Sequence, residues 1–297
     1  MISKPSSIQN AHTAGDKSSR RLDTRLRYYK FLLSIRPTQL GSVAKALLRV
    51  KRRVVKSSIG VSYWADPVSV FGFELLSQGC FERDLTNVVQ KLLRPSDVFV
   101  DVGGNEGYFS ILAARQVRNG RVICVEPQRR LIPVIQRNTA LNATTQAVSI
   151  QNVALSNQSG QAQLYLRPSS NTGASSFYRH WKLGFARQSV TTKRFDDLMS
   201  ELHISAIRLV KVDCEGAELL VLSGATDILQ RQLVNFWVVD YHDKITSLEA
   251  CERTHKLFCN AGYRLAKHKD LCIYFTAAQR ADLTAVGGYR FADSWRE

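Results

Sequence analysis

Three short stretches of the sequence combine acidic residues with glycines in a way that suits a ligand site. The first is DVGGNEG at residues 101–107, which continues the apolar run VFV. The second is Glu126, which ends the run RVICV, and the third is DCEGAE at residues 213–218. Glycine removes the side chain that would keep a ligand away from the backbone. A carboxylate accepts hydrogen bonds or pairs with a cation. These stretches therefore contain the candidate functional residues.

The glycine loop excludes two phosphate-binding motifs. A Walker A loop needs Lys-Ser or Lys-Thr after its glycines, and neither follows here. The dinucleotide fingerprint needs its first glycine where this chain has Val102. An aspartate at the strand end would repel a pyrophosphate but suits the amino group of S-adenosylmethionine (SAM), whose carboxylate can meet free helix N–H groups. We expect the loop to bind SAM through Asp101, Gly103, Asn105 and Gly107.

Glu126 strengthens the SAM prediction. It ends the second apolar run, nineteen residues after Gly107. A carboxylate at the tip of the second strand holds the ribose diol in nucleoside-binding α/β folds. An acid before a helix is also a common helix-start residue. Combined with the glycine loop at this spacing, Glu126 is predicted to bind the ribose of SAM.

The third stretch supplies candidates for catalysis. Asp213 follows the apolar run IRLVKV, and two more acids, Glu215 and Glu218, follow closely. Acids at a helix start complement its dipole, which is an alternative role for Glu218. A base that removes a proton from an acceptor hydroxyl is expected here, with Asp213 first, Glu215 second and His242 third. Carboxylates also suit Mg²⁺, but no further ligand is identifiable, so we expect a site without metal.

The elements that must position these residues alternate between strand and helix patterns. Apolar, β-branched runs at 98–102, 121–126, 148–154, 207–213 and 234–240 are separated by helical segments. This alternation predicts a doubly wound α/β sheet that is mainly parallel. YRLAK and LCIYFT are joined by only HKD, so they are predicted to form an antiparallel C-terminal hairpin. The polar segment 167–189 is predicted to be a loop beside the acceptor, where Tyr178, His180 and Trp181 could stack on a sugar.

The positive charge is concentrated at the N-terminus. Residues 1–57 contain fourteen lysines and arginines and two aspartates, and so carry twelve of the sixteen net positive charges. We expect a basic extension at 1–57 with a disordered start and short amphipathic helices, a catalytic domain at 58–280 and a tail at 281–297. The extension could contact an anionic membrane or nucleic acid. The chain shows no apolar signal segment, and its six cysteines are scattered, which is typical of a cytoplasmic protein that is at most peripheral at the membrane.

The chain resembles the FkbM-type family of SAM-dependent methyltransferases. The resemblance rests on DVGGNEGYFS (101–110), VEP (125–127), NTALN, NVALS and LVKVDCEGAELLVLSGA (209–225), and it runs from about residue 72 to 276. VDYHD (239–243) departs from the glutamate-containing strand end common in the family. The resemblance implies a class I methyltransferase (Rossmann-like) fold with strand order 3-2-1-4-5-7-6. It also implies methyl transfer to a hydroxyl of a sugar, glycolipid or natural product. Glu82, an acidic residue before the first helix of the family's entry segment, is expected from the resemblance to bind the cofactor.

Two other functions stay open at this stage. The basic N-terminus is compatible with an RNA methyltransferase that acts on a ribose 2′-hydroxyl. Base-amino RNA methyltransferases carry Asn/Asp-Pro-Pro-aromatic where this chain has DCEG, so nucleic acid is the less favoured partner and a small-molecule or glycan acceptor is preferred. The other alternative is a non-catalytic SAM-binding protein, which the intact acidic residues disfavour.

Overall fold

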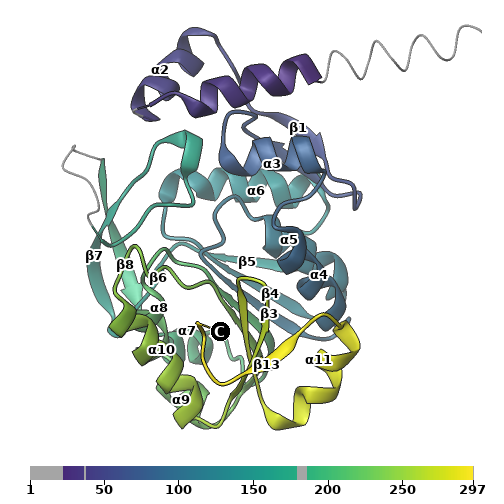
Figure 1. The fold of residues 1–297 in the computed structure, drawn as a ribbon, viewed down its shortest axis with the longest axis vertical. Helices are drawn as coiled ribbons and strands as arrows, with labels where there is room; N and C mark the ends of the chain where they lie inside the picture. Colours follow the sequence, from purple (N-terminus) through teal and green to yellow (C-terminus); the bar gives the residue numbers. More distant parts are fainter. Residues whose placement is uncertain (1–22, 37, 179–185, 297) are drawn as a thin grey trace, which may run out of the picture.

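A computed structural model describes residues 23–36, 38–178 and 186–296, and an eight-stranded sheet forms its centre (Figure 1). The order across the sheet is β5 (Val148–Gln151), β4 (Arg121–Val125), β3 (Val98–Val102), β9 (Ile207–Val212), β10 (Val234–Val239), β12 (Leu271–Phe275), β11 (Arg264–His268) and β13 (Arg290–Ala292). The first five strands are parallel to one another, and β12 runs antiparallel to β10. The expected order 3-2-1-4-5-7-6 and the antiparallel hairpin β11–β12 are confirmed.

Helices cover both faces of this sheet because successive strand residues point to opposite sides. On β3, Phe99 packs into one core and Val100 into the other. The first core lies under α4 (Arg83–Leu92), α5 (Tyr108–Gln116) and α11 (Arg280–Val286). The second lies under α7 (Phe195–Glu201), α8 (Glu218–Ser223), α9 (Thr226–Gln230) and α10 (Leu248–Asn260). With both faces buried, the strands read as continuous apolar runs, which is why they could be predicted.

The C-terminal residues are part of the domain rather than a tail. The helix α11 contacts α4, and β13 pairs with the outer edge of β11. Arg208 on β9 is 7% exposed and its guanidinium bonds the Asp282 carboxylate of α11 at 2.9 Å. The expectation of a tail at 281–297 is therefore corrected, because this segment covers a sheet edge and a buried guanidinium.

From residue 23 onward, the described part of the N-terminal segment contains two helical stretches and a hairpin, at the purple end of Figure 1. Residues 23–34 are helical, α2 spans Thr38–Leu47, and β1 (Arg53–Lys56) pairs with β2 (Ser62–Ala65). The boundary suggested at residue 57 thus falls inside a hairpin. The amphipathic helices agree with the sequence prediction, whereas the predicted disorder of residues 1–20 lies outside the described residues.

The hairpin is fastened to α6 (Ile132–Leu141) rather than to the central sheet. Asn138 Oδ1 accepts a bond from the backbone N–H of Trp64 at 2.6 Å. Asn142 accepts from the N–H of Ser62 at 3.0 Å and donates to its carbonyl at 2.7 Å. Two asparagines one helical turn apart thus bond the backbone at the free edge of β2 and take the place of a neighbouring strand.

A small three-stranded sheet lies beside the central one, in the order β6 (Ala154–Leu155), β8 (Arg187–Lys193) and β7 (Gly160–Tyr165). β8 is a strand in part of the segment predicted to be a loop, and its polar residues alternate with the buried Val190 and Thr192. Three more elements precede β8 in the sequence and contribute to the site described below. They are α3 (Val70–Gln78) and two short helical turns, η1 (Arg129–Leu131) and η2 (Ser169–Asn171). His180 and Trp181 lie outside the described residues.

Along the described ranges, none of the helices is both long and apolar enough to cross a lipid bilayer.

Candidate functional site

A cavity of about 320 Å³ opens at the carboxyl ends of β3, β4, β9 and β10. Ligands of open α/β folds bind at this edge, and the volume is within the range of small-molecule sites. Seven of the nine residues predicted from the sequence to act at the site line the cavity, along with other residues: Glu82, Gly103, Asn105, Glu126, Asp213, Glu215 and His242. Asp101 and Gly107 are not among the lining residues in the described part of the chain.

Gly103 is required by the protein's own backbone. Its φ is +79°, and a Cβ there would lie 1.9 Å from the carbonyl oxygen of Asp213. Gly107 begins α5 with a φ of +84°, and its Cβ would meet Ile135 at 3.1 Å. The sequence reading assigned these glycines to the approach of a ligand. In the structure they let the loop after β3 pack against the end of β9 and against α6, so the two acidic stretches are held together.

Asp101 lies behind the loop, not on the cavity surface. Its side chain is fully buried, Oδ2 accepts a bond from Ser110 Oγ at 2.7 Å, and Oδ1 is 3.6 Å from Lys211 Nζ. The predicted contact of Asp101 with the amino group of SAM is therefore not supported by this geometry. Its carboxylate instead fixes the ammonium of Lys211, which does line the cavity.

Glu126 occupies the position expected for a ribose ligand. Its side chain is 2% exposed, Oε2 accepts from the backbone N–H of Asn105 at 2.8 Å, and Oε1 accepts from that of Gln128 at 2.8 Å. Burial raises the pKa of Glu126 to about 7, although these two N–H groups oppose the shift. Asn105 has a positive φ of 47°, which turns its N–H toward the carboxylate. A carboxylate on the cavity wall that accepts these two backbone bonds keeps further lone pairs for a diol.

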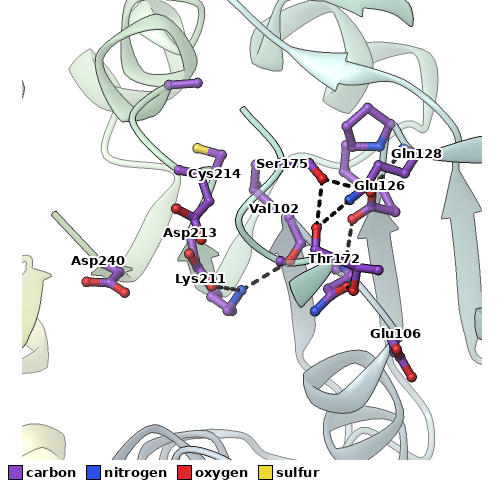
Figure 2. A pocket seen from close by; sticks show the side chains of 18 of the residues that line it. Val102, Glu106, Glu126, Gln128, Thr172, Ser175, Lys211, Asp213, Cys214 and Asp240 are labelled. Carbon is purple, nitrogen blue, oxygen red and sulfur yellow. Dashed lines mark hydrogen bonds and ion pairs between the residues drawn. The ribbon is translucent and has the colours of Figure 1, made fainter. Parts of the chain in front are cut away.

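The loop from η2 to Ser175 closes the cavity over Glu126. Thr172 Oγ1 donates to Asn105 Oδ1 at 2.8 Å, and the Thr172 carbonyl accepts from Gln128 Nε2 at 3.1 Å. Ser175 Oγ bonds Gln128 Oε1 at 3.0 Å (Figure 2). This loop, the one predicted beside the acceptor, therefore meets the residues around Glu126. At its far end Ser176 Oγ donates to the Glu215 carbonyl at 2.6 Å.

Lys211 and Asp213 form the opposite side of the cavity (Figure 2). Lys211 is 3% exposed, and its Nζ lies 3.0 Å from Asp213 Oδ2 and 3.3 Å from the Gly103 carbonyl. Burial alone would raise the pKa of Asp213, but the charges of Lys211 and His242 hold it below its usual range. Burial would lower the pKa of Lys211, but the negative charges of Asp213, Asp101 and Glu82 raise it. Asp213 is thus an ionised partner of a fixed cation and a weak base.

His242 lies among four carboxylates. Its Nδ1 donates to Glu218 at 2.9 Å, while Nε2 is 3.7 Å from Glu215 and 3.8 Å from Asp213 and from Asp240. Burial lowers its pKa, but the bond to Glu218 and the surrounding negative charge raise it to about 10. His242 therefore carries a proton on each ring nitrogen at neutral pH, which argues against its predicted role as a base. Glu218 acts on this imidazolium in addition to beginning α8.

The remaining acids of this side have raised pKa values. Burial raises the pKa of Glu215 to about 7, with His242 opposing. Burial, followed by the charge of Asp213, raises Glu82 to about 8 and Asp240 to about 6. Glu82 precedes α4 with a positive φ of 42°. On this side of the cavity, the acidic groups therefore outnumber the two cations, Lys211 and His242. Asp213, Glu215 and His242 also have ligand atoms within 4.8 Å of one another, a spacing compatible with a metal ion.

The sequence reading missed Glu106 and Arg52. Glu106 lines the cavity at 2% exposure, and both its oxygens bond the Arg52 guanidinium, at 2.7 and 2.8 Å. Burial raises the pKa of Glu106 while Arg52 opposes the rise. Glu106 could have been proposed from the sequence, because it is an acidic residue inside the glycine loop. Arg52 carries no local signal, because it is one of fourteen basic residues in residues 1–57.

A family model and several known proteins match part of this chain. The Methyltransferase FkbM domain matches residues 101–265, more than half of the chain. The methyltransferase sdnD of Sordaria araneosa is 27% identical over 55% of this chain and 73% of its own length. The 2-O-methyltransferase NoeI of Sinorhizobium fredii is 26% identical over 53% and 68%. The hexuronic acid methyltransferase AglP of Haloferax volcanii is 27% identical over 54% and 62%.

The matched region contains both sides of the cavity, from the glycine loop and Glu126 through Asp213 to His242. The buried carboxylate at the ribose position and the loop held by Gly103 fit a nucleoside cofactor, and the fold is that of class I methyltransferases. The chain therefore belongs to the FkbM family of methyltransferases, enzymes whose methyl donor is SAM.

Proposed function

We propose that this enzyme methylates a hydroxyl group of a sugar or a related polyhydroxylated small molecule. The observation that carries the proposal is the cluster around His242, opposite Glu126, where carboxylates lie at 3.7–3.8 Å from one imidazole nitrogen. These separations exceed a hydrogen bond, so the carboxylates keep acceptor capacity. Several hydroxyl donors on one ring would satisfy such a cluster. A flat apolar acceptor would leave it unsatisfied.

Each side of the cavity has a separate task in this reaction. Bound there, SAM supplies a methyl group already activated on a sulfonium. Glu126 would hold its ribose, and the loop around Gly103 would fix its position relative to Asp213. The acceptor oxygen must lie about 3 Å from the methyl carbon and in line with the sulfur. Lys211, anchored by Asp101 and Asp213, keeps the wall between the two sides rigid.

Glu215 is the best candidate for the base. Its pKa of about 7 is close to the value at which a general base is most effective, whereas Asp213 is held ionised by Lys211 and His242 is already protonated. The backbone of Glu215 has a positive φ of 52° and its carbonyl is held by Ser176. An uncommon backbone conformation kept by surrounding contacts is typical of functional positions. The order expected from the sequence, with Asp213 first, is revised accordingly.

The names of two relatives support this proposal, one by methyl transfer to oxygen and the other by a sugar-acid acceptor. One is named a 2-O-methyltransferase and another a hexuronic acid methyltransferase. The test is a turnover assay that follows S-adenosylhomocysteine formation with a panel of sugars, uronic acids and lipid-linked glycans. We expect turnover with at least one polyhydroxylated acceptor and a product methylated on oxygen. Turnover only with RNA, lost as salt is raised, would favour the ribose alternative. Tight cofactor binding without turnover on any acceptor would favour the non-catalytic alternative.

We further propose that the N-terminal segment holds the enzyme at an anionic membrane surface. Leu40, Val43 and Leu47 form a stripe along α2 and are 55%, 55% and 78% exposed. Exposed Phe31 lies on the preceding helical residues, among exposed basic side chains that include Arg25 and Lys30. Apolar groups flanked by lysine and arginine suit the headgroup region of a bilayer. A lipid-linked glycan acceptor would be concentrated there.

Sedimentation with vesicles tests this surface. The variant Val43→Gln/Leu47→Gln should bind vesicles of phosphatidylserine and phosphatidylcholine more weakly than the unaltered protein, and binding should weaken as salt is raised. Leu248→Gln is the matched control, since it removes an exposed leucine at the start of α10. Equal sedimentation of all three proteins would contradict the proposal.

A further inference from the structure

We propose that Arg52 is a positioning residue of the cofactor site, and that residues 45–52 clamp the glycine loop and the rim of the cavity. This inference deepens the proposed function, because it concerns the same cavity. It assigns a task to a segment that lies outside the matched family domain. The charge pattern alone suggested that this segment is separable from the catalytic domain.

The first contact is between Arg52 and Glu106. The guanidinium bonds both carboxylate oxygens, and it also donates to the Trp64 carbonyl at 3.0 Å. Bidentate pairs of this kind restrict both position and orientation. Glu106 lies next to Asn105, whose N–H bonds Glu126. The Arg52 side chain therefore fixes the loop at the residue that follows Asn105, and Asn105 bonds the carboxylate of Glu126, the proposed ribose ligand.

The second contact runs through Asn138 on α6. Its amide nitrogen donates to the Glu106 carbonyl at 2.9 Å, and its amide oxygen accepts from the Trp64 N–H. The Glu106 backbone and side chain are thus both tied to the β1–β2 hairpin. Two independent connections to one loop residue make the hairpin part of the support of the cofactor site.

The third contact is made by Lys45 on α2. Its ammonium pairs with the buried carboxylate of Asp66 and lies 3.2 Å from Ser169 Oγ. Asp66 leads into Ser69 at the start of α3, and Ser169 leads into Thr172; both Ser69 and Thr172 line the cavity. One lysine thus joins two rim segments that are far apart in the sequence.

The energetic reason is the burial of Glu106. A buried carboxylate that loses the cation bonded to it becomes protonated or moves toward water. Either change releases the side chain from its position, and the adjoining Asn105 N–H loses its alignment with Glu126. Cofactor affinity should therefore depend on Arg52, although Arg52 is not among the residues that line the cavity in the described part of the chain.

The experiment compares Arg52→Met with Lys51→Met in the full-length protein. Lys51 is exposed and adjacent, so its substitution removes the same charge without the contact. The dissociation constant of S-adenosylhomocysteine, measured by calorimetry, should rise about tenfold or more in Arg52→Met and stay unchanged in Lys51→Met. Arg52→Lys should fall between them, because lysine keeps the charge but loses the bidentate geometry.

Thermal unfolding without ligand accompanies each measurement. If Arg52→Met alone is unfolded, Arg52→Met/Glu106→Gln replaces it, since this pair leaves no buried charge unpaired, and the same weakening is expected. An unchanged dissociation constant in a folded Arg52 variant, or equal losses in the Arg52 and Lys51 variants, would overturn the proposal. Failure to find a sugar acceptor would leave these outcomes unaffected, because they are measured with S-adenosylhomocysteine alone.

Discussion

The two sides of the cavity are organised in different ways. On the cofactor side, Glu126 is held by two backbone N–H groups, and the loops around it bond one another at 2.8–3.1 Å. On the acceptor side, three carboxylates surround one imidazole nitrogen at 3.7–3.8 Å. The first side is pre-organised by the backbone, whereas the carboxylates of the second side keep unused capacity to accept hydrogen bonds. In the proposed reaction, the methyl donor binds to the fixed side of the cavity, and the side around His242 supplies the base that takes the hydroxyl proton.

The largest expected effect tests this division on the acceptor side. Glu215→Gln should lower kcat by about 10²–10⁴-fold, because an amide cannot take the hydroxyl proton in the transition state. The dissociation constant of S-adenosylhomocysteine should change little. Asp240→Asn is the control, since its carboxylate is also near His242 but half exposed. An unchanged kcat in Glu215→Gln would remove Glu215 from the mechanism and return Asp213 to first place.

The second prediction concerns the loop that joins the two sides. Gly103→Ala should destabilise the fold by about 3 kcal/mol, from a positive φ and from the clash of its Cβ with the Asp213 carbonyl. Gly60 has the same φ of +79° but its Cβ would meet nothing closer than 4.0 Å. Gly60→Ala should therefore cost only about 1 kcal/mol. Urea unfolding measures both. Equal losses would mean that the loop and the end of β9 are not in rigid contact.

A smaller effect is expected at Glu126, where it depends on pH. Its pKa is about 7, raised by burial, and the ionised form accepts the ribose hydroxyls better than the neutral form. Affinity for S-adenosylhomocysteine should therefore increase as pH rises from 6 to 8. Glu126→Gln should lose about 1.5–3 kcal/mol of binding at pH 8 and show a flatter profile. Calorimetry at three pH values decides the matter, and identical profiles for both proteins would contradict the ribose assignment.

The smallest expected effect is that of a chelator. Lys211 and the protonated His242 already place two cations among the acids, so methyl transfer should be unchanged by EDTA, as expected from the sequence. The assay compares untreated enzyme, enzyme with EDTA, and enzyme with EDTA followed by Mg²⁺. Activity that falls with EDTA and returns with Mg²⁺ would assign the Asp213, Glu215 and His242 cluster to a metal ion instead.

The sequence predicted the elements that are buried on both sides and the residues that end them. The strands β3, β4, β9 and β10 are apolar runs in the sequence. Glu126 and Asp213 could be predicted because each is the first residue after one of these runs, β4 and β9 respectively. β13 and β8 could not be found in this way, because one is three residues long at a sheet edge and the other is polar on one side.

The polar contacts of the site were harder to predict. Asp101 was assigned to the ligand because a carboxylate at a strand end suits the amino group of SAM, yet here Ser110 and Lys211 enclose it. The pair Arg52–Glu106 joins residues 54 positions apart, and a contact between residues so far apart produces no periodic pattern in the sequence. The charge state of His242 depends on Glu218, which only the packing of α8 against the end of β10 brings within 2.9 Å.

The hairpin that fastens the N-terminal segment also has a consequence for synthesis of the chain. Trp64 contacts Asn138, a residue 74 positions later, and the ribosome releases the N-terminus first. Residues 1–57, which carry most of the net charge, therefore emerge well before the helix to which the hairpin attaches. During translation the nascent chain presents its most basic segment to its surroundings without a folded partner. If the proposed contact with an anionic membrane holds, it can therefore form before the catalytic domain has been synthesised.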